Sequence, residues 1–152
     1  MRIEYLCENK QYIDTVVKWI YNEFIKGIRP GISYERVESG FWQRGKEALP
    51  ITIVVVEDKT CIGAASLVVN DLKPREYTPW LAGLYVDKEY RNKGIGKVLI
   101  KEIEAIAHRF GYDTLYLRTE HASGYYRKIG WSFVEKLIDE FGLETSVFIK
   151  RL

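Results

Sequence analysis

Cysteine is scarce in this sequence. The 152 residues include two, Cys7 and Cys61, which are too few and too isolated to form a disulfide framework. Neither belongs to a cluster with the spacing of metal ligands, so we expect no metal site. Cys61 stands in a strand-like segment, where a free cysteine usually packs as a small apolar side chain.

Long apolar runs and an excess of charge are also missing. No stretch approaches the ~18 apolar residues of a membrane-spanning helix, and the first residues lack the apolar core of a signal peptide. The 23 Lys and Arg against 21 Asp and Glu leave a formal net charge of +2, which gives no general attraction to nucleic acid or to a membrane. We therefore expect a cytoplasmic protein with neither of these as a partner.

Hydrophobic residues are abundant, at 47%, and aromatic residues make up 14%, which argues against disorder. A chain of this length can bury one domain core, and we expect residues 1–152 to form a single domain. Apolar periodicity and turn residues predict helices over residues 11–25, 34–49, 95–109 and 123–129. Ser33 is expected to cap the second helix. Strands are predicted over residues 2–6, 51–56, 61–69, 79–86, 113–118, 131–137 and 143–150. This order is typical of a mixed α/β layer fold.

Residues 84–97 are the stretch around which the chain is organised. An apolar, strand-like segment ends at Val86, a charged turn follows, and Arg91-x-x-Gly94-x-Gly96 opens a helix. Glycines let a backbone approach a ligand closely, and the free N–H groups and dipole of a helix N-terminus favour an anion. Residues 91–101 contain four cations and no acid. The stretch predicts a phosphate-binding loop; the alternative is an ordinary strand–helix connection with solvated cations.

Two common phosphate loops do not fit this stretch. A Walker loop needs Gly-x-x-x-x-Gly-Lys-Ser/Thr, which the sequence does not contain. A dinucleotide-binding loop needs Gly-x-Gly-x-x-Gly, but Leu99 stands where the third glycine belongs. The residues alone therefore leave the phosphate ligand open.

Two ordered motifs resemble those of the GNAT superfamily of N-acetyltransferases. Leu84-x-Val86 followed by Arg91-x-x-Gly94-x-Gly96 is similar to the acetyl-CoA signature, and the segment 122–131, Ala-x-x-Tyr-Tyr-Arg-Lys-Ile-Gly-Trp, is similar to the downstream motif. Together with their surroundings they cover most of residues 50–151, while the first 49 residues match only in coarse pattern. The resemblance implies a central, mostly antiparallel sheet flanked by helices, and acetyl-CoA as cosubstrate without a metal.

The resemblance also implies the cofactor-binding residues. The pantetheine arm would pair with the strand-like residues 84–86 as an added strand would. A backbone N–H at or near Leu84 would face the thioester oxygen. The pyrophosphate would rest on backbone N–H groups of the loop, and Thr119 stands where the family often has an asparagine that reaches the cofactor. The residues implied are Leu84, Tyr85, Val86, Arg91, Asn92, Lys93, Gly94, Ile95, Gly96, Lys97 and Thr119.

Tyr126 is the residue implied as general acid, because the family often has tyrosine four positions before the glycine of the second motif. A phenol near pKa 10 can deliver a proton to a departing thiolate near pKa 8.5 with little mismatch. The alternative is that Tyr126 is a core tyrosine on a short helix. Its neighbour Tyr125 corresponds to an apolar position, and we expect it to pack.

The general base is not identified by the sequence. Some family members have a glutamate on the strand before the phosphate loop, but the matching residue is Trp80, and residues 80–86 contain no acid. The nearby groups that could take a proton are Glu76, Asp71, Glu120 and His121, and ordered water is an alternative. We expect the acceptor site among the first two helices and the 70–78 loop, where the residues able to hold a cation are Tyr34, Glu35, Glu38, Trp42 and Glu76; the alternative is a solvated helix face.

The resemblance therefore implies an acyltransferase that moves an acetyl group from acetyl-CoA to a primary amine of a small molecule or peptide. The alternative function is a non-catalytic acetyl-CoA-binding sensor or scaffold, which would have no need of Tyr126. A nucleic-acid-binding role for the basic loop is disfavoured by the acids that flank it, Asp87, Glu89, Glu102 and Glu104. The C-terminal strands and Trp131, which we expect to be exposed, could support a homodimer.

Overall fold

One seven-stranded sheet forms the centre of the molecule, in the order β1-β2-β3-β4-β5-β7-β6. The computed structural model describes residues 1–152. Only β4 and β5 run parallel, and the other neighbouring strands are antiparallel, which confirms the predicted mixed α/β fold. The strands are β1 (Arg2–Tyr5), β2 (Ile51–Glu57), β3 (Thr60–Val68), β4 (Trp80–Val86), β5 (Thr114–Thr119), β6 (Ser132–Ile138) and β7 (Glu144–Arg151).

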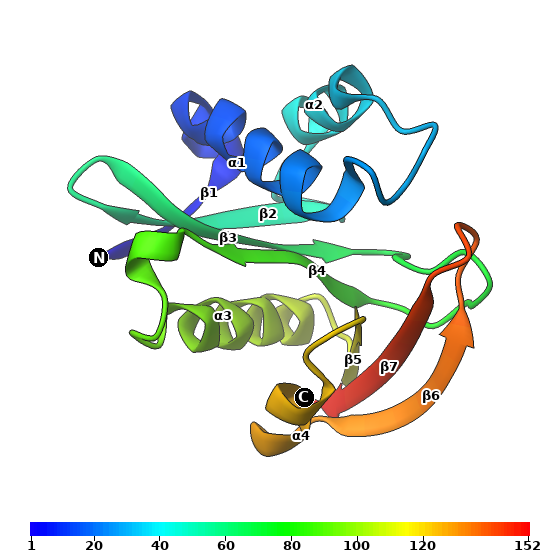
Figure 1. Ribbon diagram of the computed structural model, residues 1–152. Coiled ribbons are helices and arrows are strands. Elements are labelled where there is room, and N and C mark those ends of the chain that lie inside the picture. The colour runs from blue at the N-terminus through cyan, green and yellow to red at the C-terminus, as the bar shows by residue number, and fades with distance from the viewer.

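Helices cover both faces of this sheet (Figure 1). The helices α1 (Ile13–Ile20) and α2 (Tyr34–Gln43) lie over one face, and α3 (Ile95–Arg109) lies against the opposite face. The short helix α4 (Ser123–Lys128) follows β5. Strand β2 is therefore enclosed on both sides: Ile53 and Val55 pack in the core that contains α3, while Val54 packs in the core that contains α1. This explains why residues 53–56 are all apolar rather than alternating with polar residues.

The first two predicted helices differ from expectation in their ends. The first begins in short 3-10 turns, continues as α1 and finishes as a π-helical turn, Tyr21–Ile25. The second begins where predicted, because the Ser33 side chain accepts a hydrogen bond from the N–H of Arg36 at 3.1 Å. It ends at Gln43 rather than residue 49, because the backbone of Arg44 is extended and its guanidinium turns toward β2 and β3.

The parallel strands β4 and β5 diverge, and this fork in the sheet was not predicted. They share a single register position, Trp80 opposite Tyr116. Strand β4 also contains a bulge: between the pairs Ala82–Ser66 and Tyr85–Ala64, two residues of β4 face one residue of β3. Gly83 within the bulge has φ +60°, which glycine adopts without strain. Beyond Trp80 and Tyr116, the edges of β4 and β5 that face each other across the fork form no strand pairing.

Trp131 is buried rather than exposed, so the expectation that it supports a dimer is wrong. It follows Gly130, whose φ of +101° turns the chain back. Its side chain is 3% exposed within the core that contains α3, and its ring lies 6.2 Å from that of Tyr126. The exposed apolar side chains of this region are on the edge strand β6 instead, including Phe133 and Ile138.

The two cysteines are unpaired. Cys61 is buried, which confirms the prediction that it packs as a small apolar residue, and burial raises the pKa of its thiol to about 12. No three His, Cys, Asp or Glu side chains gather as metal ligands would. No helix combines the length and the apolar character needed to cross a bilayer.

Candidate active site

A cavity of about 680 Å³ lies between the end of β4 and the start of α3. It contains nine of the eleven residues predicted to bind the cofactor: Leu84, Tyr85, Val86, Arg91, Asn92, Gly94, Ile95, Gly96 and Lys97. The sequence did not indicate Glu23, Phe24 and Tyr90, which also line it. Tyr125, which was expected to pack, lines it as well; it is 41% exposed and its ring lies 5.3 Å from that of Tyr126.

The start of α3 presents unpaired N–H groups to this cavity. Gly94 caps the helix with φ +81°, and the first helical hydrogen bond runs from the N–H of Val98 to the carbonyl of Gly94 at 3.2 Å. The N–H groups of Ile95, Gly96 and Lys97 therefore have no partner in the chain. A Cβ at Gly96 would meet no atom of the protein, so the space beside it is open. Free donors, an open backbone and adjacent cations fit a diphosphate.

Two of the predicted residues lie outside this cavity. The Lys93 ammonium lies 5.4 Å from the centre of the Tyr90 ring, and Lys93 does not line the cavity. Thr119 lines a second cavity, and its Oγ1 accepts a hydrogen bond from the N–H of Ala122 at 2.9 Å. Thr119 thus fixes the turn that leads from β5 into α4.

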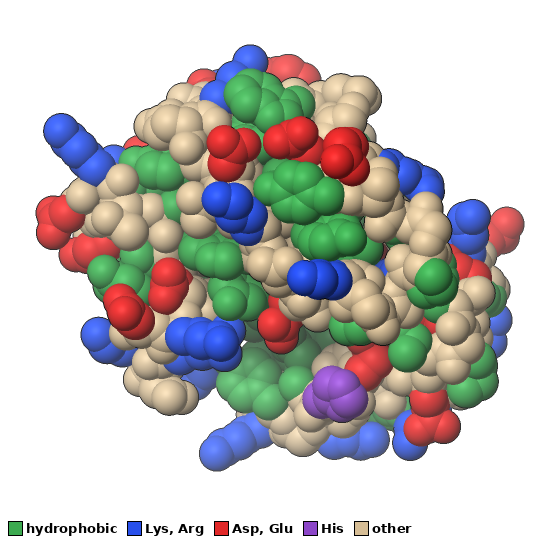
Figure 2. Space-filling view, turned by 45° about the horizontal axis from the view of Figure 1, so that its top comes forward, with side chains coloured by type: hydrophobic (Ala, Val, Ile, Leu, Met, Phe, Trp, Pro, Cys, Tyr) green, Lys and Arg blue, Asp and Glu red, His purple; other side chains and the backbone are tan.

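The second cavity is larger, about 900 Å³, and opens between the α1–α2 side of the sheet and the loop after β5. In the space-filling view a hollow with apolar and acidic walls opens on this face (Figure 2). Both cavities are lined by Glu23, Phe24, Leu84 and Ala122, so they meet at the fork between β4 and β5. The arrangement can bring a ligand held by α3 into contact with one held in the larger cavity.

Tyr126 lies in the wall of the larger cavity. Its ring packs against Trp131 and Phe148, and its hydroxyl has no hydrogen-bond partner in the chain. Burial, and to a smaller degree the neighbouring Tyr125, raises the pKa of Tyr126 to about 12. The phenol is therefore protonated throughout the neutral range.

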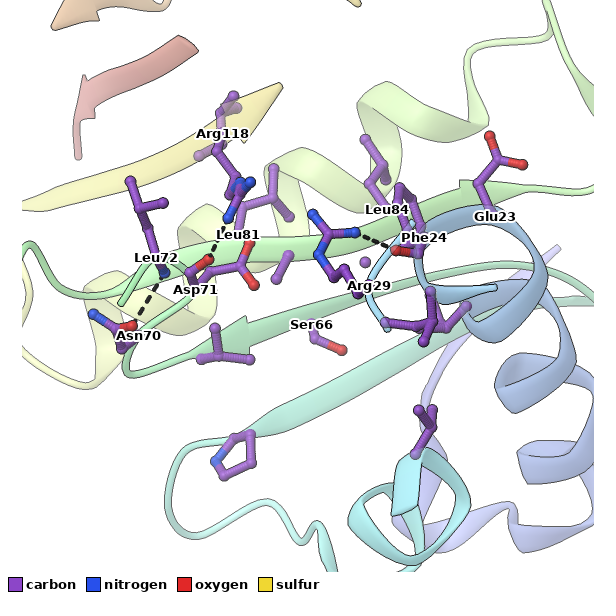
Figure 3. A pocket seen from close by; sticks show the side chains of 18 of the residues that line it. Glu23, Phe24, Arg29, Ser66, Asn70, Asp71, Leu72, Leu81, Leu84 and Arg118 are labelled. Carbon is purple, nitrogen blue, oxygen red and sulfur yellow. Dashed lines mark hydrogen bonds between the residues drawn. The ribbon is translucent and has the colours of Figure 1, made fainter. Parts of the chain in front are cut away.

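Asp71 also lies in the wall of the larger cavity, and close-up it lies beside Leu81 and Arg118 (Figure 3). Its backbone is fixed on both sides: Asn70 accepts a hydrogen bond from the N–H of Leu72 at 3.1 Å, and Arg118 donates to the Asp71 carbonyl at 3.1 Å. The Asp71 carboxylate accepts no hydrogen bond from the protein. Burial raises the pKa of Asp71 to about 6, although Arg118 and Arg29 oppose the shift.

The charges around Asp71 form one cluster. Arg118 donates to Asp139 at 2.6 Å and lies 3.6 Å from Glu120, which is also 3.9 Å from Arg29. Burial alone would raise the pKa of Asp139, but hydrogen bonds from Arg118 and from two backbone N–H groups lower it. Two arginines thus face Asp71, Asp139 and Glu120, and Glu140 is close enough to raise the pKa of Asp71 as well, so the cluster has an excess of negative charge when all are ionised.

The other groups named as bases are placed differently. Glu120 and His121 line the larger cavity, but Glu120 is engaged by the Thr145 hydroxyl at 2.7 Å as well as by the arginines. Glu76 is exposed and does not line the cavity. Trp80 is fully buried in an apolar cluster with Leu72.

The larger cavity lies where the acceptor site was expected, beside the first two helices and the 70–78 loop. None of the residues expected to hold a cation lines it, which corrects that part of the prediction; these were Tyr34, Glu35, Glu38, Trp42 and Glu76. The polar lining includes Arg29, Arg44 and Arg118, which the sequence analysis missed. Arg29 follows the helix-breaking Gly27, and its guanidinium donates to the carbonyl of Phe24. Arg44 and Arg118 have partners 22 and 21 residues away in the sequence, so no local pattern marks them.

Comparison with known proteins agrees with this geometry. The sequence model of the acetyltransferase (GNAT) family matches residues 14–131. A protein of Chlorobaculum tepidum, named as an uncharacterized N-acetyltransferase, is 31% identical over 75 residues. That alignment covers 49% of this chain and 45% of the relative, so it spans about half the length of either protein.

Solved structures share the whole fold at low sequence identity. The ribosomal-protein-alanine N-acetyltransferase of Brucella melitensis matches with a TM-score of 0.76 at 18% identity, covering 100% of both chains. An aminoglycoside 6'-N-acetyltransferase complexed with coenzyme A matches with a TM-score of 0.74 at 18% identity, covering 99% of this chain and 97% of the other. At such identities the likeness shows the fold alone.

Proposed function

Because this chain belongs to the acetyltransferase (GNAT) family, we propose that it transfers an acetyl group from acetyl-CoA to a primary amine of a small molecule or peptide. The observation that carries the proposal is the meeting of the two cavities at the fork between β4 and β5. A donor bound at α3 and an acceptor bound in the larger cavity would meet there, as direct transfer between two bound molecules requires.

The donor would be held mainly by backbone groups. The free N–H groups of Ile95, Gly96 and Lys97 would bind the diphosphate, with Arg91 and Lys97 adding positive charge. The unpaired edge of β4 at residues 84–86 would pair with the pantetheine arm as an added strand would. A backbone N–H of the bulge near Leu84 would face the thioester oxygen as it gains negative charge.

Asp71 is the carboxylate that this site offers as general base. The acceptor nitrogen forms a bond to the carbonyl carbon of the acetyl group, the C–S bond breaks, and the nitrogen loses one proton. Asp71 faces the cavity without a hydrogen bond from the protein, so it is free to take that proton. Glu120 is less suited, because it is already paired with arginine and threonine.

Tyr126 would assist the departing sulfur. Its free hydroxyl and its place in the cavity wall fit a donor to the leaving thiolate. Since burial raises the pKa of Tyr126 to about 12, well above the ~8.5 of a thiol, complete proton transfer is less favourable than for an ordinary tyrosine. We therefore assign Tyr126 the role of donating a hydrogen bond to the sulfur as charge develops there.

Thiol release from acetyl-CoA, measured against a panel of amines, tests the proposal. The panel contains amino acids, polyamines, aminoglycosides and peptides with free N-termini, and binding of CoA is measured in parallel by calorimetry. Turnover that depends on one class of amine supports a transferase. Tight binding of CoA with no thiol release for any amine would instead support the sensor or scaffold.

A further inference from the structure

Arg44 carries a positive charge that no carboxylate in the protein neutralises. Its Nη1 donates to the hydroxyls of Thr52 and Ser66, at 3.0 and 2.9 Å, and its guanidinium lies 4.1 Å from the centre of the Phe41 ring. No acidic oxygen lies within ion-pair distance of it. Burial lowers the pKa of Arg44 to about 10, so the group remains charged at neutral pH.

Arg44 borders the larger cavity, and its guanidinium has donors that no group of the protein uses. Arg44 lines the cavity together with Ser66 and Pro50. Its Nε is enclosed without an acceptor, and its Nη2 donates to no group of the protein. A buried charge that is held by hydroxyls and an aromatic ring, without a carboxylate, is costly to keep, and an anionic ligand would relieve that cost. Guanidinium groups bind carboxylate and phosphate oxygens in a paired geometry.

A complementary charge lies in the same cavity. The Asp71 carboxylate accepts no hydrogen bond, lies close enough to Arg44 to affect its titration, and forms no ion pair with it. Two unpaired groups of opposite charge in one cavity suit a ligand that carries both an amine and an anion. The amine end belongs near Asp71, where the charge cluster has an excess negative charge.

We propose that the acceptor is a small primary amine that also carries a carboxylate, such as a free amino acid, with its amine at Asp71 and its carboxylate at Arg44. This inference rests on the proposed acetyl transfer and specifies its substrate class. Polyamines and aminoglycosides carry several positive charges and no anion, so Arg44 would repel them.

The first test uses the unmodified protein and matched acceptors. Each common amino acid is compared with its own α-amide in the thiol-release assay, with rates expressed per neutral amine, because the amine of the amide has a lower pKa. We expect kcat/KM for the best amino acid to exceed that for its amide by about 10- to 100-fold, since a charge-assisted hydrogen bond is lost. Equal rates for acid and amide, or a preference for polyamines, would overturn the inference while leaving acetyl transfer intact. No turnover with any amine would overturn both.

The second test changes the arginine. We expect Arg44→Gln to raise KM for the amino acid about 10-fold or more and to leave KM for the amide nearly unchanged, which abolishes the discrimination. Lys46→Gln removes the same charge from an exposed site that lines neither cavity, and it should preserve the discrimination. A circular dichroism melt checks that both variants fold. A discrimination that survives in folded Arg44→Gln protein would contradict a role for Arg44.

Discussion

Trp80 and Tyr116 form the one register pair that joins the parallel strands β4 and β5, and their rings lie 5.7 Å apart. The Tyr77 ring stacks on Tyr116 at 4.9 Å, and Leu72 and Val147 complete an apolar cluster around Trp80. The apex of the fork is therefore held by packed aromatic side chains. An acid at position 80 would be buried there without a partner, whereas a tryptophan fits this apolar environment.

Trp80→Ala should destabilise the protein strongly. Removing a fully buried tryptophan leaves a cavity, and we expect the free energy of unfolding to fall by about 3–5 kcal/mol. Trp42→Ala is the matched control, because Trp42 is 46% exposed and should cost less than about 1 kcal/mol. Urea denaturation followed by circular dichroism measures both. Similar losses for the two variants would refute the importance of the apex cluster.

Gly96→Ala should weaken CoA binding without weakening the fold. The residue lies in the first turn of α3 with space for a Cβ, so alanine should leave the free energy of unfolding equal or slightly higher. A bound diphosphate would meet that Cβ, and we expect Kd for CoA to rise about 10-fold, or ~1.4 kcal/mol. Gly45→Ala, at an exposed glycine outside both cavities, should change neither. Isothermal titration calorimetry measures Kd for CoA in each variant.

Tyr126→Phe should lower kcat more than it raises KM. The phenyl ring keeps the packing against Trp131 and Phe148, while the hydroxyl proposed to donate to the leaving sulfur is lost. We expect kcat to fall about 10- to 100-fold, less than for most general acids, because the hydroxyl donates a hydrogen bond to the sulfur without full proton transfer. Steady-state kinetics at several pH values provides the check. A variant with full turnover across that range would exclude a role for the hydroxyl in catalysis.

Protonation of Asp71 should lower kcat/KM in acid, in addition to the loss caused by protonation of the acceptor amine. As general base Asp71 must be ionised, and its pKa is raised to about 6 by burial, with Glu120 and Glu140 adding to the shift and Arg118 and Arg29 opposing it. We therefore expect the slope of log kcat/KM against pH to become one unit steeper below about pH 6. Asp71→Asn should lower the rate and remove this break. A break that persists in the variant must belong to another group.

The same substitution should make the protein more stable at neutral pH. The raised pKa means that the folded state holds the Asp71 proton more tightly than the unfolded state, so stability falls as pH rises from about 4 to about 6. Asp71→Asn has no such dependence, and we expect it to be about 1–2 kcal/mol more stable at pH 7 and nearly equal to wild type at pH 4. Thermal and urea unfolding at both pH values measure the difference.

The local parts of the structure could be predicted from the sequence. The helix α3 and the loop before it were predictable because apolar spacing and the Gly94 and Gly96 pattern are properties of neighbouring residues. The fork was not, because Trp80 and Tyr116 meet through tertiary packing. Ser33 was predictable in the same way, because it caps a helix through a bond to Arg36, three residues on. The position of Arg44 was not predictable, because its partner Ser66 is 22 residues away.

The residues predicted to hold the acceptor were wrong for a further physical reason. Residues such as Glu35 and Trp42 have the chemistry to hold a cation, but helix geometry directs them away from the cavity. Asp71 was one of several groups near the expected site that could take a proton, and its neighbours in the sequence do not indicate that it is buried. Its surroundings are assembled from β5 and from the β6–β7 turn, through Arg118 and Asp139.

The open fork also allows binding at the donor site to be followed by hydrogen–deuterium exchange. Backbone amides of β4 and β5 that face each other beyond Trp80 and Tyr116 have no partner strand, so their hydrogens should exchange rapidly with deuterated solvent. A pantetheine arm seated along residues 84–86 would protect the amides on its side. Deuterium uptake at these positions would therefore report occupancy of the donor site directly, without an acceptor and without turnover.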